Sequence, residues 1–142
     1  MSGGQDCGLP ANRLPAIRIM TMPADTNPDG AIFGGWLMSQ VDIAGSVEAL
    51  RIVRGRIATV AVNAFQFRHP VLVGDLVSFY ADVVKVGRTS VTVAVEVYAQ
   101  RNPAKPECVK VTEATLTYVA LDENNRPHYI QYSEDGTFRG EQ

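Results

Sequence analysis

The sequence has only two cysteines among 142 residues, Cys7 and Cys108, and no spacing of cysteine and histidine that is typical of a metal site. Two cysteines do not make the disulfide framework of a small secreted domain, so reduced cysteines and a cytoplasmic location are favoured. The sequence also lacks an apolar run of about 18 residues, as well as a signal peptide. We therefore expect a cytoplasmic protein that does not insert into a membrane.

An excess of one charge is absent as well. Thirteen Lys and Arg residues oppose fifteen Asp and Glu residues, which gives a formal net charge of −2. No nucleic acid partner is expected, since binding to many phosphates needs a broad basic surface. The length suits one domain with its own core. We predict a flexible N-terminal arm over 1–14, a single domain over 15–130 and a C-terminal tail over 131–142.

One long helix is predicted after a loop at 23–30 that is rich in Pro, Asp, Asn and Gly. Apolar residues then recur at steps of three and four, which indicates an amphipathic helix from Ile32 to about Arg54. Gly34, Gly35 and Gly45 each disfavour this helix by about 1 kcal/mol relative to Ala. Close approach of another part of the chain would explain why glycine stands at these positions.

Strand patterns occupy most of the remaining sequence. Alternation of β-branched and aromatic residues predicts strands at 58–68, 76–86, 90–101 and 107–121, and a shorter strand at 16–22. Short turns between consecutive strands favour antiparallel pairing. The predicted fold is α+β, with a curved antiparallel sheet wrapped around the single central helix.

The loop and the helix start carry groups suited to hydrolysis of an acyl compound. Asn27 lies in the loop, free backbone N–H groups are expected at residues 32–35, and Asp42 is a carboxylate among apolar helix residues. N–H groups at a helix N-terminus stabilise an oxyanion, and glycine allows a carbonyl group to approach them closely. A partly desolvated carboxylate is suited to act as a general base towards water.

Three sequence motifs resemble those of a known family. They are Asn27-Pro-Asp-Gly-Ala-Ile-Phe-Gly-Gly with Met38 and Asp42, Phe67-Arg-His-Pro-Val with Val73-Gly-Asp, and Gly87-Arg-Thr-Ser. Together they resemble the hotdog-fold acyl-CoA thioesterases, specifically the bacterial broad-specificity acyl-CoA hydrolases related to the brain acyl-CoA hydrolases. The resemblance implies hydrolysis of fatty acyl-CoA to free acid and coenzyme A, by a homodimer or by a hexamer that is a trimer of dimers.

The resemblance also implies roles for individual residues. Asp42 corresponds to the catalytic carboxylate, Asn27 to an asparagine that orients the thioester or the water, and the helix start at Gly34 and Gly35 to the oxyanion site. A turn near the nucleotide part of coenzyme A corresponds to Arg88, Thr89 and Ser90. No metal and no separate cofactor are expected, because coenzyme A is part of the acyl-CoA substrate.

Helix geometry places a limit on how these residues meet. Gly35 and Asp42 are seven residues apart and therefore lie about 10 Å apart along one helix. General base catalysis works across about 3 Å. We therefore expect an active site shared between subunits, in which Asp42 of one copy meets Asn27 and the helix start of another.

Two other functions are compatible with the predicted fold. A non-catalytic acyl-CoA sensor would bind the thioester without cleaving it. A hydratase or dehydratase acting on an acyl thioester normally needs a catalytic histidine near the helix. The two histidines of this sequence, His69 and His128, both follow residue 68, which argues against this alternative.

Overall fold

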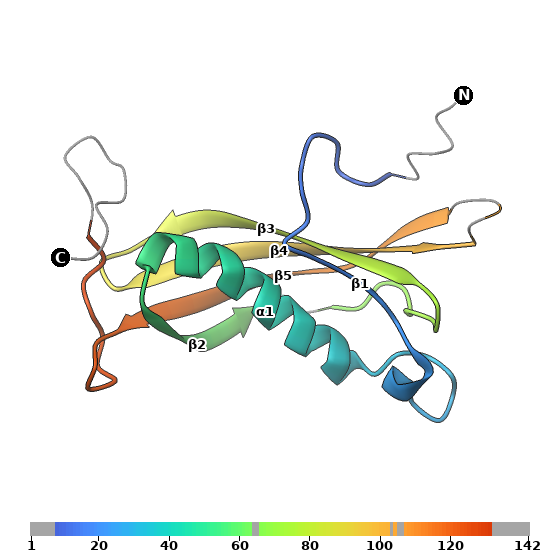
Figure 1. Ribbon diagram of the computed structural model, residues 1–142, viewed down its shortest axis with the longest axis horizontal. Coiled ribbons are helices and arrows are strands. Elements are labelled where there is room, and N and C mark those ends of the chain that lie inside the picture. The colour runs from blue at the N-terminus through green and yellow to red at the C-terminus, as the bar shows by residue number, and fades with distance from the viewer. Residues whose placement is uncertain (1–7, 64–65, 103, 105–106, 132–142) are drawn as a thin grey trace.

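The computed structural model describes residues 8–63, 66–102, 104 and 107–131. Its elements are β1 (Ile17–Met20), the short 3-10 helix η2 (Pro23–Asp25), α1 (Gly34–Val53), β2 (Arg56–Asn63), β3 (Leu76–Val86), β4 (Ser90–Arg101) and β5 (Glu107–Leu121). The strands form one antiparallel sheet in the order β1-β3-β4-β5-β2, so β1 and β2 are its edges. Helix α1 crosses one face of this sheet (Figure 1).

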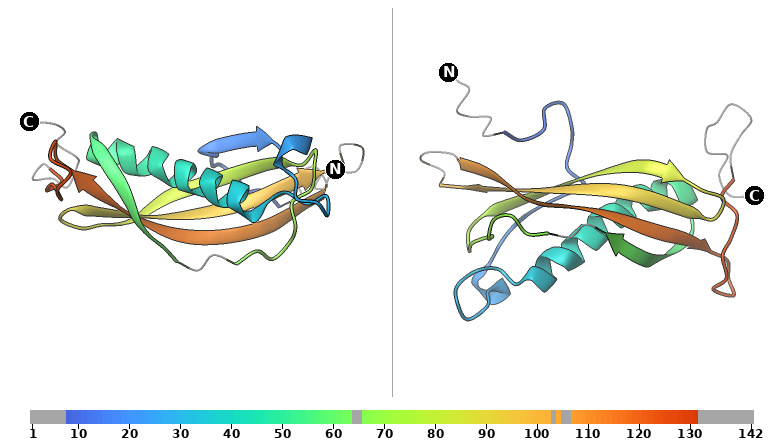
Figure 2. Two further views of the ribbon diagram at one scale, coloured as in Figure 1. Left: turned by 90° about the horizontal axis from the view of Figure 1, so that it is seen from below. Right: turned by 180° about the vertical axis from the view of Figure 1, so that it is seen from behind.

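The side view shows the strands bending along α1, so the predicted curved antiparallel sheet around one central helix is confirmed (Figure 2). The predicted bounds of β3, β4 and β5 are also confirmed. The helix begins two residues later than its apolar periodicity indicates, at Gly34. The backbone N–H of Ile32 instead donates to Val71 O at 2.8 Å, and that of Phe33 donates to Asp25 O at 3.0 Å.

The first long strand is shorter than predicted, because β2 ends at Asn63 rather than continuing to Arg68. The register of β2 against β5 shifts between Thr59 and Ala61, which marks a β-bulge. Beyond the strand, Arg68 N–H still donates to Val111 O at 2.8 Å. Arg68 therefore lies beside β5, outside the residues that form β2.

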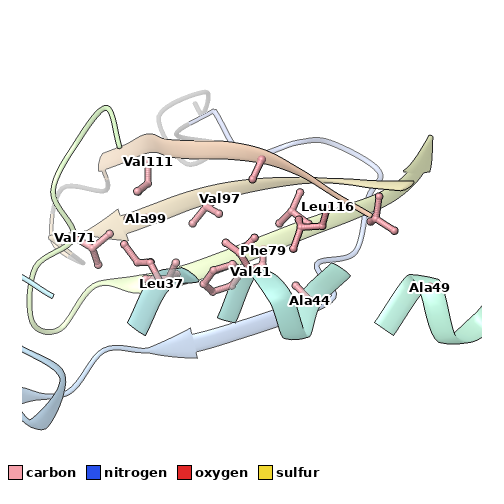
Figure 3. Close-up of a cluster of buried hydrophobic side chains, with 14 of the residues drawn as sticks. Leu37, Val41, Ala44, Ala49, Val71, Phe79, Val97, Ala99, Val111 and Leu116 are labelled. Carbon is pink, nitrogen blue, oxygen red and sulfur yellow. The ribbon is translucent and has the colours of Figure 1, made fainter. Parts of the chain in front are cut away.

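The core lies between α1 and the inner face of the sheet. Leu37, Val41 and Ala44 of the helix pack towards side chains of β3, β4 and β5 (Figure 3). Alternate residues of these strands are fully buried because successive side chains of a strand point to opposite faces. The buried set includes Val77, Phe79, Val91, Val93, Val95, Val97, Leu116 and Tyr118.

Ion pairs cover the opposite, outer face of the sheet. Arg13, within the predicted arm, pairs with Asp82 and, at 3.0 Å, with Glu96. Lys110 pairs with Glu96 at 3.2 Å and with Glu113 at 2.6 Å. The division into arm, domain and tail stays a prediction, since residues 1–7 and 132–142 lie outside the described part of the chain.

Cys108 takes part in a disulfide bond, which differs from the reduced cysteines predicted from the sequence. The prediction used cysteine number and spacing, and neither reports which segments the fold brings together. Cys7 lies outside the described residues.

Candidate functional site

Asp42 is half-buried in α1 and receives a hydrogen bond from the edge strand β2. The hydroxyl of Thr59 donates to Asp42 Oδ1 at 2.7 Å. A hydrogen bond to a carboxylate is among the stronger hydrogen bonds in proteins, and it fixes the orientation of the acceptor. One carboxylate oxygen is thereby held.

A second contact holds the main chain of the same residue. The Tyr118 hydroxyl of β5 donates to the carbonyl O of Asp42 at 2.7 Å. Burial, followed by the charge of Asp42, raises the pKa of the Tyr118 hydroxyl, which therefore stays a donor. A β-carbon built at Gly45 would overlap this hydroxyl, so the predicted close approach at Gly45 is found.

The helix start provides two free backbone donors. Trp36 N–H donates to Phe33 O at 3.1 Å, whereas Gly34 and Gly35 N–H have no acceptor in the part of the chain that the structure describes. The sequence-based expectation of free N–H groups at Ile32 and Phe33 is wrong, because the loop contacts described above use both groups. The free donors are thus confined to the two glycines.

The two glycines differ in their surroundings. A β-carbon at Gly34 would lie 3.3 Å from the Phe67 ring, whereas one at Gly35 would meet nothing within 4 Å. The space above Gly35 is therefore open to a ligand or to another copy of the chain. Phe67 forms one wall beside the free N–H groups, and it is half exposed.

Asn27 lies in the loop before the helix with its side chain already engaged. Its Oδ1 accepts hydrogen bonds from Asp29 N–H at 2.9 Å and from Ala31 N–H at 3.1 Å. These contacts form an Asx turn, in which the asparagine side chain holds the loop. The side-chain NH₂ remains as the group that a ligand could contact, because no described residue accepts from it.

The structure does not bring all predicted site residues together within one copy. Among the described residues, no hydrogen bond joins Asp42 to Asn27, and eight helical residues place Asp42 about 12 Å along the axis from Gly34. The turn with Arg88 and Thr89 joins β3 to β4 at the sheet end next to the C-terminal end of α1, whereas Gly34 lies towards the other end (Figure 1). Ser90 begins β4 at this same turn, where its carbonyl accepts from Gly87 N–H at 2.7 Å.

Apolar side chains near Asp42 are exposed. Met38, one helical turn earlier, is 45% exposed, and the neighbouring Ile43 is 50% exposed. On β2, Val60 at the bulge is 57% exposed and Val62 is 41% exposed. Clustered exposed apolar residues at a sheet edge mark a surface that a partner or ligand covers.

Sequence reasoning missed two residues that contact Asp42, namely Thr59 and Tyr118. Both lie in strands whose alternation predicts only which face a side chain occupies. Their proximity to Asp42 depends on the pairing of β2 with β5, which sets Thr59 opposite Tyr118. No sequence motif reports that pairing.

The part of the chain that the structure describes, residues 8–63, 66–102, 104 and 107–131, shows two absences. No group of three or more His, Cys, Asp or Glu side chains there could hold a metal ion. None of the helices there combines the length and the apolar character needed to cross a bilayer.

Comparison with known proteins gives consistent matches. The acyl-CoA thioester hydrolase YciA of Escherichia coli K12 is 47% identical over 116 residues, which cover 80% of this chain and 88% of that protein. The crystal structure of Cj0915 of Campylobacter jejuni, described as a hexameric hotdog fold thioesterase, superposes with a TM-score of 0.79 at 41% identity, covering 86% of this chain and 92% of that one. The predicted hotdog fold is confirmed by this likeness.

A more distant likeness concerns two mutants of the acyl-CoA hydrolase of Staphylococcus aureus. Both are 25% identical with a TM-score of 0.72, covering 80% of this chain and 69% of theirs. One has an aspartate and the other a threonine replaced by alanine, at positions 43 and 60 of that protein. The model of the thioesterase superfamily matches residues 29–106 of the present sequence. The chain therefore belongs to the thioesterase superfamily.

Proposed function

We propose that this protein hydrolyses fatty acyl-CoA thioesters to free fatty acid and coenzyme A. The observation that carries the proposal is the Asp42 carboxylate, which the Thr59 hydroxyl orients through a hydrogen bond of 2.7 Å. Exposed apolar side chains surround this carboxylate. The name of the Escherichia coli relative, an acyl-CoA thioester hydrolase, supports the same substrate class. The aspartate and threonine replaced in the Staphylococcus aureus hydrolase are spaced 17 residues apart, as are Asp42 and Thr59.

In the proposed reaction, Asp42 removes a proton from a water molecule as the water oxygen attacks the thioester carbonyl carbon. The carbonyl oxygen becomes an oxyanion and accepts hydrogen bonds from Gly34 and Gly35 N–H at the positive end of α1. When the intermediate collapses, the carbon–sulfur bond breaks and coenzyme A leaves as its thiolate, which takes up a proton. Thr59 keeps the carboxylate oriented throughout.

The active site is proposed to be shared between copies of the chain. One copy separates Asp42 from its own helix start by about 12 Å, which exceeds the reach of a general base. The edge strand β2 and the exposed Met38, Ile43 and Val60 offer a surface for a second copy beside Asp42. The hexameric state of the Campylobacter jejuni relative supports an assembly of this kind, and we propose a homodimer within a trimer of dimers.

The turn at Arg88, Thr89 and Ser90 is proposed to contact the nucleotide part of coenzyme A. Arg88 is exposed, and a guanidinium group binds phosphate oxygens through paired hydrogen bonds. Because this turn and the helix start lie at opposite ends of the sheet, a substrate that touches both would also span two copies. The cytoplasmic location expected from the sequence stays a prediction.

The test is release of free thiol from acyl-CoAs of several chain lengths by the purified protein. Asp42→Ala is expected to lower kcat by about 100-fold or more, and Asn27→Ala by a smaller factor. Glu123→Gln, an exposed change in the turn after β5, serves as the control and should match the wild type. Equal thiol release by Asp42→Ala would refute the mechanism, and binding of acyl-CoA without any release would favour the sensor.

Mixed assemblies test the shared site. Asp42→Ala and Asn27→Ala subunits are mixed in equal amounts, unfolded together and refolded together. A dimer with one subunit of each kind contains one intact site, so random mixing should restore about a quarter of wild-type activity. If hybrids assemble and stay as inactive as the separate variants, the site lies within one copy.

A further inference from the structure

Thr59 and Tyr118 are direct partners across the β2–β5 pairing. Side chains of directly opposed residues lie on the same face of a sheet, about 5 Å apart. Both contact Asp42, but at different atoms. Thr59 reaches the carboxylate, and Tyr118 reaches the backbone carbonyl, each at 2.7 Å.

The sheet is irregular at this pair. The register of β2 shifts immediately after Thr59, so two residues of β2 occupy the space of one on β5. Such bulges redirect side chains and occur often next to active sites. The irregularity lies at the residue that holds the Asp42 carboxylate.

The Tyr118 hydroxyl does more than fill space. Tyr118 is fully buried, and the benzene ring of a phenylalanine would fill the same core volume. The hydroxyl lies against the helix at Gly45, and a side chain at position 45 would collide with it. Thus a glycine within the helix accommodates a single oxygen atom that fixes the backbone of Asp42.

We propose that Tyr118 is a positioning residue for Asp42, which sets the distance between the Asp42 main chain and Thr59. Movement of α1 relative to β2 would break the Thr59 hydrogen bond, because Thr59 is anchored in the sheet and Asp42 in the helix. Tyr118 prevents that movement at the backbone of Asp42 itself. The inference rests on the proposed function only for its effect on catalysis, since the effect on carboxylate geometry is independent of it.

The kinetic test compares Tyr118→Phe with Tyr80→Phe. Tyr80 is also buried, and its hydroxyl accepts from Arg18 at 3.2 Å on the outer face of the sheet, away from α1. Both variants lose one hydroxyl hydrogen bond of the same sheet. We expect kcat for Tyr118→Phe to fall by about 10-fold to 100-fold at unchanged KM. Tyr80→Phe should stay within twofold of the wild type.

A second measurement does not depend on activity. The Asp42 carboxyl ¹³C signal is recorded in the wild type, Thr59→Ala, Tyr118→Phe and Tyr80→Phe. Thr59→Ala removes the carboxylate hydrogen bond and sets the scale of the change. Tyr118→Phe should move the signal in the same direction, and Tyr80→Phe should leave it in place.

The outcomes separate the two proposals. If the wild-type protein releases no thiol, the proposed hydrolysis is refuted, while the carboxyl signal still decides whether Tyr118 positions Asp42. If Tyr118→Phe leaves that signal at its wild-type position, the positioning role is overturned. A fall in kcat no larger than that of Tyr80→Phe overturns it as well, even in an active enzyme.

Discussion

The hydroxyl oxygen of Tyr118 lies too close to the position of a β-carbon at residue 45 for a side chain to fit there, so Gly45 and Tyr118 form one contact between α1 and β5. Alanine at position 45 would push against a buried ring. Overpacking of this kind costs about 1–3 kcal/mol, whereas the better helix propensity of alanine returns about 1 kcal/mol.

Gly45→Ala is therefore expected to lower the free energy of unfolding in urea by up to about 2 kcal/mol. Gly35→Ala is the matched control, because its new methyl group meets nothing within 4 Å. In a Tyr118→Phe background the loss from Gly45→Ala should shrink, since the closest atom is gone. Equal stability of Gly45→Ala and Gly35→Ala would contradict the contact.

Replacement of Thr59 tests the orientation of the carboxylate. Thr59→Val keeps the shape of the side chain and removes the donor to Asp42. We expect kcat for acyl-CoA hydrolysis to fall by about tenfold or more, while Thr59→Ser retains most activity because it keeps the hydroxyl. Thr117→Val, on the neighbouring strand β5, is the control. A Thr59→Val enzyme with wild-type kcat would show that the hydrogen bond is dispensable.

A buried ion pair is expected to stabilise the loop beside the helix start. The Asp75 side chain is 2% exposed, receives a hydrogen bond from Arg101 at 2.8 Å, and accepts another from Leu72 N–H at 2.9 Å. Removing one partner of a buried ion pair leaves the other charge buried and unpaired, which destabilises the fold by about 3 kcal/mol or more. Asp75→Ala and Arg101→Met should each lower the free energy of unfolding by roughly that amount, somewhat less for the partly exposed Arg101.

The control for that pair is Arg51→Met. Arg51 also pairs with a carboxylate, Glu48 at 3.0 Å, but its side chain is 74% exposed. Exposed pairs contribute about 0–1 kcal/mol, so this change should be nearly neutral. The double variant of Asp75 and Arg101 should lose less stability than the sum of the two single variants. Additive losses would mean that the two side chains act independently.

The outer-face ion pairs predict a specific dependence of stability on pH. Burial acts to raise the pKa of Glu96, but hydrogen bonds from Arg13 and Lys110 outweigh it and hold that pKa below its ordinary value. A carboxylate with a lowered pKa stabilises the fold above its unfolded-state pKa, and this contribution is lost as the pH falls through the folded-state pKa. The pairs should therefore stabilise the protein at neutral pH and cease to do so in acid.

Unfolding curves of the wild type and Glu96→Gln, measured from pH 7 to pH 3, check this expectation. The wild type should be the more stable protein at pH 7, and the difference should narrow below about pH 4.5 as the carboxylate protonates. Glu123→Gln provides the exposed control. A difference that stays constant over the whole range would exclude the ionised form of Glu96 as its source.

The fold was largely predictable because its signals are local. Alternation of side chains located β3, β4 and β5, and the apolar period located α1. Asp42 was recognisable as a lone carboxylate in that apolar pattern. Its partner Thr59 was not, since the contact requires both the register of β2 on β5 and the bulge that follows Thr59.

The helix start illustrates the same limit. Local sequence reasoning counts the first N–H groups of a helix as free. The N–H of Ile32 is used by Val71, whose backbone approaches from a loop near β3. Contacts between segments distant in sequence decide which donors remain for a substrate, and here they leave those of Gly34 and Gly35.

The loop before α1 is closed on itself by its own hydrogen bonds. Asn27 N–H donates to Ala31 O at 2.7 Å, and Gly30 N–H donates to Asn27 O at 3.0 Å. The Asn27 side chain adds two further bonds within the loop. The conformational entropy of this segment is therefore lost when the chain folds rather than when a ligand arrives. In the proposed reaction, a thioester that reaches Gly34 and Gly35 meets donors already in place, so its binding energy is not spent on ordering the loop.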